Sequence, residues 1–308
     1  MVERGLLIRH DRGLRVAMQI NADVTHFDAT NAESRKFIWS KVKKNYYDLG
    51  IKVFWLDEAE PEFTIYDYDI IRYHAGTDLP IGNIYPKEYA RAFYEGMEAE
   101  GQTNIVNLLR CAWAGSANWL RASTWASQVY PGGTTDIGGF RGGDIRDPKF
   151  HELFVRWFQW GAFCPVMRLH GDREPKTGKD SATGADNEIW SYGDEVYEIC
   201  KKYINIRETL RDYTRDLMKE AHEKGSPLIR PMFYEFPKDD KAWTTETQYM
   251  YGSKYLVAPV LSPKEAKRTV YLPADTSWKS WDGGESRKGG QTVEVACSID
   301  TMPVFVRE

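Results

Sequence analysis

The feature that most constrains the fold is a repeated alternation of an apolar strand, a polar residue and an amphipathic helix. The predicted strands cover residues 14–20, 51–56, 104–109, 163–167 and 227–236, and the predicted helices cover 32–49, 86–100, 150–161 and 194–224. This alternation is typical of a parallel α/β fold. A charged residue follows several of the strands, which favours a TIM-type barrel whose active site lies at the C-terminal ends of its strands. A doubly wound sheet has the same alternation, but no GxGxxG motif follows the first strand to indicate a dinucleotide site.

The chain changes character after residue 236. Short apolar strands at 255–260, 268–272, 291–295 and 302–306 are separated by glycine and proline turns. This pattern indicates a small antiparallel β-sandwich. Because the preceding strands number fewer than the eight of a complete barrel, we predict a partial (β/α)8 barrel over 1–236, followed by a β-domain over 237–308.

Composition excludes several classes of protein. Lys and Arg total 41 against 45 Asp and Glu, a net charge of −4 with no basic run, which argues against nucleic-acid binding. No apolar stretch approaches the roughly 20 residues of a membrane helix. The four cysteines are widely spaced and predict no metal site or disulfide framework, so we expect reduced thiols and a cytoplasmic protein. Aromatic residues reach 14%, which fits either core packing or a site that stacks flat rings.

The segment 54–62, Phe-Trp-Leu-Asp-Glu-Ala-Glu-Pro-Glu, carries the clearest chemical signal. A buried strand ends in four carboxylates within six residues. Repulsion between such close negative charges is costly unless the carboxylates bind a ligand or take part in a reaction. Glycoside cleavage uses paired carboxylates. The alternative is a solvated loop with a metal or arginine partner. A phosphate site at Gly138-Gly139 and Gly142-Gly143 is a poorer interpretation, since no lysine follows at P-loop spacing.

The sequence resembles glycoside hydrolase family 31, in its bacterial α-xylosidase and α-glucosidase branch. The segments that carry the resemblance cover nearly the whole chain in the family's order: 27–31, 43–48, 55–62, 92–96, 107–116, 134–140, 156–159, 165–171 and 255–260. Among them are Trp-Leu-Asp-Glu-Ala-Glu-Pro-Glu, Thr-Thr-Asp-Ile-Gly-Gly-Phe and Pro-Val-Met-Arg-Leu-His-Gly. The resemblance implies a carbohydrate substrate and a retaining mechanism without a metal or organic cofactor.

The resemblance also implies roles for single residues. Asp57 matches the catalytic nucleophile. Arg110 matches an arginine that contacts the sugar and the site's carboxylates, and Asp136 matches the aspartate of the Asp-Ile-Gly-Gly-Phe motif near the same sugar. Arg168 and His170 match an Arg-x-His pair that hydrogen-bonds the sugar.

Two tryptophans complete the predicted site. Trp55 and Trp113 match aromatic positions near the family's pocket. Either could instead be a core residue, and Arg168 could merely pair with Asp172.

The sequence departs from the family in two places. The chain opens near what resembles the third or fourth barrel strand, so the family's upstream residues are expected to be missing.

The Trp-Ser-Gly-Asp segment that holds the family's acid/base aspartate is also absent, which leaves the acid/base residue unassigned. Residues 118–133 instead match nothing in the family. Read one frame out of register, with suitable synonymous codons, they give Leu-Ala-Ala-Gly-Leu-Asn-Met-Gly-Ile-Ala-Gly-Ile-Pro-Trp-Trp, which looks like the family's missing helix and strand.

We therefore hypothesise that Asn118–Gly133 is translated out of frame after a deletion that removed the acid/base segment. General acid catalysis contributes about 10²–10⁴-fold, so natural glycosides should barely turn over. Asp136, Asp144 or Asp172 could substitute only with a carboxyl about 5–5.5 Å from Asp57. The leading interpretation is an α-glycosidase by descent. The alternative is an impaired or inactive family member that keeps at most weak sugar binding.

Overall fold

Parallel strands joined through a helix occur twice in the structure. In the first case β2 (Phe54–Leu56) pairs with β5 (Asn107–Leu109), and α3 (Tyr85–Ala99) lies between them in the chain. In the second, β6 (Arg141–Asp144) pairs with β7 (Asp172–Glu174), with α4 (Pro148–Gly161) between them. Parallel neighbours need such a crossover connection, so the predicted α/β fold is confirmed.

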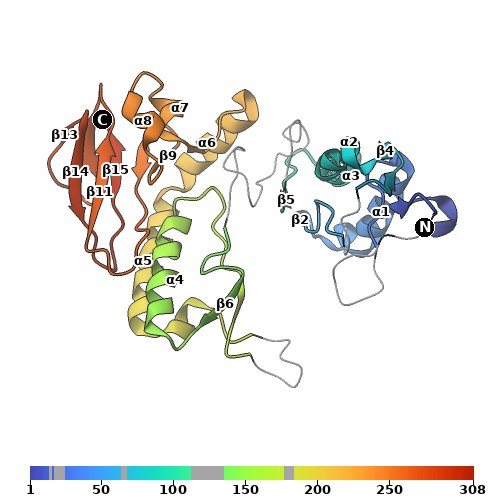
Figure 1. Cartoon of the computed structure of the whole chain (residues 1–308), viewed down its shortest axis with the longest axis horizontal. Coiled ribbons are helices and arrows are strands. Elements are labelled where there is room, and N and C mark those ends of the chain that lie inside the picture. The colour runs from blue at the N-terminus through green and yellow to red at the C-terminus, as the bar shows by residue number, and fades with distance from the viewer. Residues whose placement is uncertain (14–15, 17–24, 64–67, 112–134, 177–183) are drawn as a thin grey trace. The chain divides into compact units, whose positions relative to one another are not determined.

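The computed structural model describes residues 1–13, 16, 25–63, 68–111, 135–176 and 184–308. The chain divides into two units, residues 1–130 and 131–308 (Figure 1). The predicted boundary at 236/237 falls inside the second unit and stays a prediction. Of the predicted strand at 14–20, all but Val16 lies outside the described residues.

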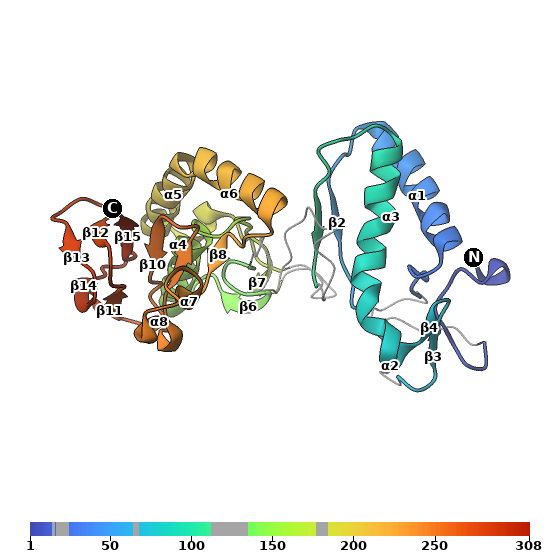
Figure 2. The same cartoon turned by 90° about the horizontal axis from the view of Figure 1, so that it is seen from above.

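The first unit packs two helices on the β2–β5 pair. Helix α1 (Ala32–Asn45) begins at Asn31, whose side chain accepts a hydrogen bond from the Glu33 backbone N–H, as expected of an N-cap. It lies beside α3 (Figure 2), and apolar residues of α3, β2 and β5, such as Phe93, Leu56 and Leu109, form one buried cluster. The remaining elements are η1 (Val2–Arg4), β1 (Arg9–His10), η2 (Tyr47–Leu49), β3 (Ile71–Tyr73), β4 (Gly76–Thr77), α2 (Asp78–Ile81) and η3 (Gly82–Ile84). Strands β1, β3 and β4 form a small sheet over a second apolar cluster.

The second unit begins with β6, α4 and β7 and continues through η5 (Ile189–Tyr192), α5 (Asp194–Thr209) and α6 (Arg211–Lys224). Helices α4 and α5 pack against each other (Figure 1), with Phe154 fully buried in their shared core. Burying one such side chain stabilises the fold by about 1.5–3 kcal/mol.

The C-terminal part is rich in strands, as predicted. Its elements are β8 (Ile229–Arg230), α7 (Met232–Glu235), α8 (Asp240–Thr244), β9 (Tyr249–Tyr251), β10 (Tyr255–Val257), β11 (Lys267–Leu272), β12 (Ser277–Ser280), β13 (Arg287–Lys288), β14 (Gln291–Ala296) and β15 (Val304–Arg307). A six-stranded sheet has the order β13-β12-β15-β10-β9-β8, and β11 pairs separately with β14. Val270 of β11 shares a buried cluster with Leu256 of β10 and Phe305 of β15, so the two sheets pack face to face as a sandwich.

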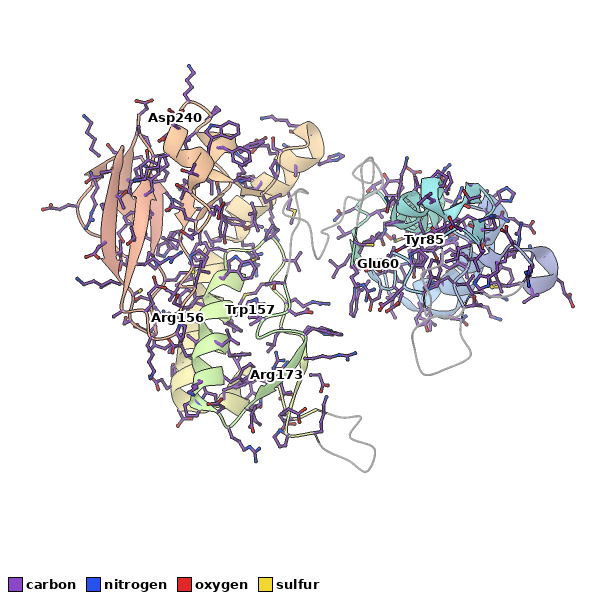
Figure 3. All side chains as sticks on the ribbon, in the orientation of Figure 1. Glu60, Tyr85, Arg156, Trp157, Arg173 and Asp240 are labelled. Atoms are coloured by element: carbon purple, nitrogen blue, oxygen red, sulfur yellow. The ribbon has the colours of Figure 1, made fainter. Side chains whose placement is uncertain are left out.

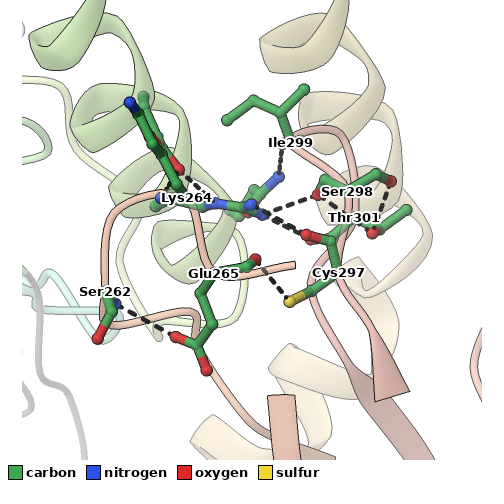
Figure 4. A network of polar contacts seen from close by, with 10 residues as sticks. Ser262, Lys264, Glu265, Cys297, Ser298, Ile299 and Thr301 are labelled. Atoms are coloured by element: carbon green, nitrogen blue, oxygen red, sulfur yellow. Dashed lines mark hydrogen bonds and ion pairs between the residues drawn. The ribbon is translucent and has the colours of Figure 1, made fainter. Parts of the chain in front are cut away.

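Arg156 of α4 (Figure 3) binds the β-rich part to the helices through the loop residues labelled in Figure 4. It is 8% exposed and donates to the carbonyls of Cys297, Ser298 and Thr301 at 3.1, 2.9 and 2.9 Å. Gln159, one turn further along α4, donates to the Ile299 carbonyl at 2.7 Å. The loop after β14 is therefore bound to α4 through its backbone.

One predicted strand is wrong, and a second is wrong in part. Residues 163–167 form no strand, because Phe163 and Cys164 donate their backbone N–H groups to carbonyls at the end of α4. In 227–236 only β8 is a strand, since Pro231 has no N–H to continue the ladder and α7 follows at once.

The predicted long helix over 194–224 is two helices. Leu210 separates α5 from α6, and the Thr209 hydroxyl donates to the Ile206 carbonyl at 2.7 Å. Such a bond competes with the helical backbone pattern and bends a helix. Leu210 itself is fully buried, so the break turns an apolar side chain into the core.

Candidate active site

The four carboxylates of the predicted site lie in the loop that follows β2. Asp57 comes directly after Leu56, the last residue of β2, and Arg110 comes directly after Leu109, the last residue of β5. Because β2 and β5 are parallel, their C-terminal ends meet at the same edge of the sheet. The strand pairing therefore places Arg110 beside the carboxylate loop.

Arg110 is the shared partner of all four carboxylates. Its Nε lies 2.6 Å from Glu60 Oε1, and its Nη2 lies 2.6 Å from Glu62 Oε2. Its Nη1 lies 3.4 Å from Glu58 Oε1, and its Nε lies 3.7 Å from Asp57 Oδ1. The arginine alternative considered for this loop is thus what the structure shows, and it is compatible with a reactive role for Asp57.

The neighbours of Arg110 have different acid–base properties. Burial raises the pKa of Glu58 to about 7, opposed by the charge of Arg110 and helped by that of Glu62. The hydrogen bond from Arg110 lowers the pKa of Glu62. Near neutral pH, Glu62 is therefore ionised while Glu58 is present in both protonation states.

Asp57 is the most accessible of these groups. Its side chain is 42% exposed, against 20% for Glu58 and 29% for Glu62. Its Oδ1 accepts no hydrogen bond from the described part of the chain. Oδ1 itself is buried, 3.7 Å from the Arg110 guanidinium, so the exposed part of the Asp57 side chain lies on its other atoms, and only these can be reached from solvent.

Trp55 precedes this loop in the chain, and His26 contacts it. Trp55 is 42% exposed on β2, which contradicts its interpretation as a core residue. His26 is buried, and its Nε2–H donates to the Glu62 carbonyl at 2.9 Å. The His26 bond fixes the backbone from which the Glu62 carboxylate reaches Arg110.

A second set of predicted residues lies together in the second unit. Asp136 forms an ion pair with Arg168, and Ile137 bridges Leu169 in parallel orientation. The rings of Phe140 and His170 stack with centroids 5.7 Å apart. The predicted residues Asp136, Arg168 and His170 are thus brought together by two adjoining segments.

The alternative for Arg168 is wrong as a description of its pairing. Asp172 forms its ion pair with Lys176, and Arg168 pairs with Asp136. Trp113 and the segment 118–133 lie outside the described residues, so the prediction for Trp113 and the frameshift hypothesis stay predictions.

The sequence analysis missed Phe140 and Arg173. Phe140 ends the Asp-Ile-Gly-Gly-Phe motif, and its place within a recognised motif was an available signal. Arg173 follows His170 by three residues in a polar segment that gives no sign of burial, yet it is 0% exposed. Over the described ranges, no group of three His, Cys, Asp or Glu side chains is arranged to hold a metal ion.

Comparison with known families decides the identity of this arrangement. The model described as "Glycosyl hydrolases family 31 TIM-barrel domain" matches residues 1–130 and 126–217, and "Glycosyl hydrolase family 31 C-terminal domain" matches 225–308. The chain belongs to glycosyl hydrolase family 31. Its fold is accordingly a partial family 31 TIM barrel followed by a β-rich domain.

Individual family 31 proteins are similar over most of this chain. An α-xylosidase of Saccharolobus solfataricus is 34% identical over 92% of the chain and 40% of its own length, and α-xylosidase A of Aspergillus niger is 33% identical over 92% and 47%. A crystal structure of a family 31 α-xylosidase from a soil metagenome, complexed with xylose, is 48% identical with a TM-score of 0.93. It is matched over 99% of this chain and 50% of its own. The chain thus spans half or less of the length of these relatives.

The helices were also considered as membrane spans. In the part of the chain that the structure describes, no helix combines the length and the apolar character needed to cross a bilayer.

Proposed function

We propose that this chain carries the nucleophile site of a retaining α-glycosidase that acts on terminal α-xylosyl or α-glucosyl residues. The observation that carries the proposal is the position of Asp57: it follows a parallel barrel strand, is 42% exposed, and lies 3.7 Å from Arg110. The substrate class follows from similarity to α-xylosidases, one of which was solved with xylose.

In the proposed reaction the Asp57 carboxylate attacks the anomeric carbon as the bond to the aglycone oxygen breaks. The product is a covalent glycosyl ester on Asp57, which water then hydrolyses to release the sugar and regenerate the carboxylate. Arg110 lies 3.7 Å from Asp57 and pairs with Glu60 and Glu62, so its charge faces the carboxylate that attacks. From the resemblance we propose Trp55 as a sugar contact in the first unit, and Asp136, Arg168 and His170 as sugar contacts in the second.

The leaving oxygen needs a proton, and the family's Trp-Ser-Gly-Asp segment is absent from this sequence. The barrel model also matches in two stretches that meet at residues 126–130, within the segment 118–133. Both observations support a lost acid/base residue. We therefore propose that the chain cleaves only glycosides whose leaving group departs without protonation, since general acid catalysis is worth about 10²–10⁴-fold.

The second candidate is a family 31 protein that binds sugar without hydrolysing it. The absence of the acid/base segment favours this candidate. In either case we propose a carbohydrate as the partner, and the expected cytoplasmic location stays a prediction.

Thermal unfolding with and without xylose or glucose tests the shared part of both candidates. A ligand that binds only the folded state must raise the unfolding midpoint. Hydrolysis of a nitrophenyl α-xyloside then separates the two candidates. We expect the unmodified chain to release nitrophenol and Asp57→Asn to release none, while the exposed control Asp240→Asn keeps the rate. Equal rates for all three proteins would contradict Asp57 as the nucleophile.

A further inference from the structure

The second unit contains a buried arginine that the proposed mechanism does not use. Arg173, in the middle of β7, has a relative exposure of 0% (Figure 3). Within the described residues it forms no ion pair; its hydrogen-bond partners are neutral oxygens, and its Cζ lies 5.3 Å from the centroid of the Phe150 ring. A buried guanidinium without a carboxylate partner is costly to desolvate, so its hydrogen bonds must be well formed.

Half of these bonds go to the loop that follows Asp136. Nη2 donates to the Ile137 carbonyl at 2.9 Å, and Nη1 donates to the carbonyls of Gly139 and Gly142 at 2.8 and 3.2 Å. Nη1 also lies 3.2 Å from the Asp172 carbonyl. One side chain therefore fixes three carbonyls of a six-residue loop.

The glycines of the loop make this arrangement possible. Gly138 and Gly139 have φ values of +85° and +87°, a region that side chains rarely adopt. A Cβ on Gly138 would lie 2.6 Å from Arg173 Nη2, and one on Gly171 would lie 2.2 Å from the Gly139 carbonyl oxygen. The backbone can approach the guanidinium only because these side chains are absent.

The loop 137–142, which Arg173 binds, is joined to the predicted sugar contacts. Asp136 immediately precedes Ile137, and its partner Arg168 accepts at its carbonyl from the Ile137 N–H at 3.4 Å. Phe140 follows Gly139 and stacks on His170, and the Phe140 carbonyl accepts from the Asp172 N–H at 2.9 Å. A shift of the loop would therefore move Asp136 and Phe140, and with them Arg168 and His170.

The other side of the guanidinium is anchored to the segment before α5. Nε lies 3.1 Å from Asn187 Oδ1 and 3.2 Å from the Tyr192 hydroxyl, which itself donates to Asn187 at 2.6 Å. The Tyr192 ring is stacked on Phe154 of α4, with centroids 4.1 Å apart. The guanidinium is thus held against the packed core, and the loop is held against the guanidinium.

We propose that Arg173 is a positioning residue: its guanidinium ties the backbone of residues 137–142 to the core and so sets the orientation of Asp136, Arg168 and His170 for sugar binding. This inference rests on the proposed function, which makes these three residues sugar contacts. A lysine in its place keeps the charge but offers donors from a single atom and lacks the planar fork that reaches Ile137, Gly139 and Asn187 together.

The test compares Arg173→Lys with Arg230→Lys as a matched control. Arg230 is also buried, at 4% exposed, but it bonds Pro227, Glu220 and Glu235 and none of the loop. Xylose affinity is measured by calorimetric titration of the full chain after circular dichroism shows that each variant is folded. We expect Arg173→Lys to weaken xylose binding by at least about tenfold and Arg230→Lys to leave it unchanged.

A spectroscopic readout keeps this inference separate from the proposed function. The Trp157 indole N–H donates to the Thr135 hydroxyl at 3.0 Å, next to Asp136, and Gly139 lies against the Trp157 ring (Figure 3). Its ¹H–¹⁵N resonance, assigned with Trp157→Phe, reports the loop whether or not sugar binds. We expect it to shift or broaden in Arg173→Lys and to stay in place in Arg230→Lys.

The outcomes are distinct. If the unmodified chain binds no xylose, the proposed function fails, and the Trp157 resonance alone decides the role of Arg173. A folded Arg173→Lys with the original resonance and affinity would overturn the positioning role. If Arg173→Lys does not fold, Tyr192→Phe replaces it, because it keeps the ring and removes one acceptor of Nε. A severalfold loss of affinity in Tyr192→Phe supports the inference, and unchanged affinity with an unchanged resonance overturns it.

Discussion

Arg110 and Arg173 each organise one set of the predicted site residues, and they do so in opposite ways. Arg110 is 21% exposed and gathers carboxylates, whereas Arg173 is fully buried and gathers mainly backbone carbonyls. Carboxylates around Arg110 can change protonation state, as the raised pKa of Glu58 indicates. The backbone carbonyls around Arg173 have no proton to gain or lose in this pH range. The comparison distinguishes the Arg110 cluster, which can take part in proton transfer, from the Arg173 contacts, which hold a loop in one conformation.

Replacing Arg173 with methionine should cause the largest loss of stability. The substitution leaves the carbonyls of Ile137 and Gly139 buried without a donor, at about 1–3 kcal/mol for each unsatisfied group. We expect the free energy of unfolding of the second unit to fall by about 3–5 kcal/mol. Urea denaturation followed by circular dichroism measures it, and a loss no larger than that of Arg110→Met would remove the contrast between the two arginines.

Gly138→Ala should disturb the same contact between Arg173 and the loop 137–142 through the backbone. Its φ of +85° disfavours a side chain, and the new Cβ would lie 2.6 Å from Arg173 Nη2. Together these effects should cost about 2 kcal/mol. Gly13→Ala is the control for backbone strain alone, because among the described residues no atom lies within 4 Å of a Cβ there, at a φ of +75°. If both variants lose the same stability in urea, contact with Arg173 adds nothing.

Arg110→Met should destabilise the first unit in a pH-dependent way. The bond from Arg110 lowers the pKa of Glu62, so its contribution is present above the pKa of the unfolded chain and is lost as pH falls through the lower folded pKa. With partial solvent screening we expect a loss of about 1–2 kcal/mol at pH 7 that becomes smaller as the pH falls below 4.5. Thermal melts across this range test it, and a loss that does not change with pH would contradict the ion-pair explanation.

Glu58→Gln should change the pH dependence of stability with the opposite sign. Burial raises the pKa of Glu58 to about 7, above the value of about 4.5 in the unfolded chain. The folded state therefore binds the proton more tightly, and its stabilisation is complete below pH 4.5 and lost as pH rises towards 7. Unfolding midpoints of the unmodified chain should fall over this interval relative to those of Glu58→Gln. Parallel curves for the two proteins would show that Glu58 titrates normally.

The sequence predicted the parts of the structure that local patterns control. Helices α1, α3 and α4, the parallel strands β2 and β5, and the strands β11 and β14 follow from apolar periodicity, caps and turns. Asp57 and Arg110 each follow a predicted strand, which is a local signal, but the roles predicted for them came from the resemblance to family 31. Leu210 was missed because an apolar residue within a helical pattern does not reveal that the core needs a break there.

Arg173 shows why the rest could not be predicted. A charged residue in a polar segment is normally exposed, and its burial depends on carbonyls that lie 31 to 36 residues earlier in the chain. The glycines at 138, 139 and 171 are visible in the sequence, but their common cause, close approach to one guanidinium, exists only in three dimensions.

The most direct test of the central claim uses α-xylosyl fluoride, whose leaving group departs without protonation. The account predicts fluoride release and a xylosyl ester on Asp57 in the peptide mass spectrum, with neither in Asp57→Asn and almost no hydrolysis of an alkyl α-xyloside. An alkyl α-xyloside cleaved as fast as the fluoride would show that an acid/base group is present after all. Fluoride release that persists in Asp57→Asn would show that Asp57 is not the nucleophile.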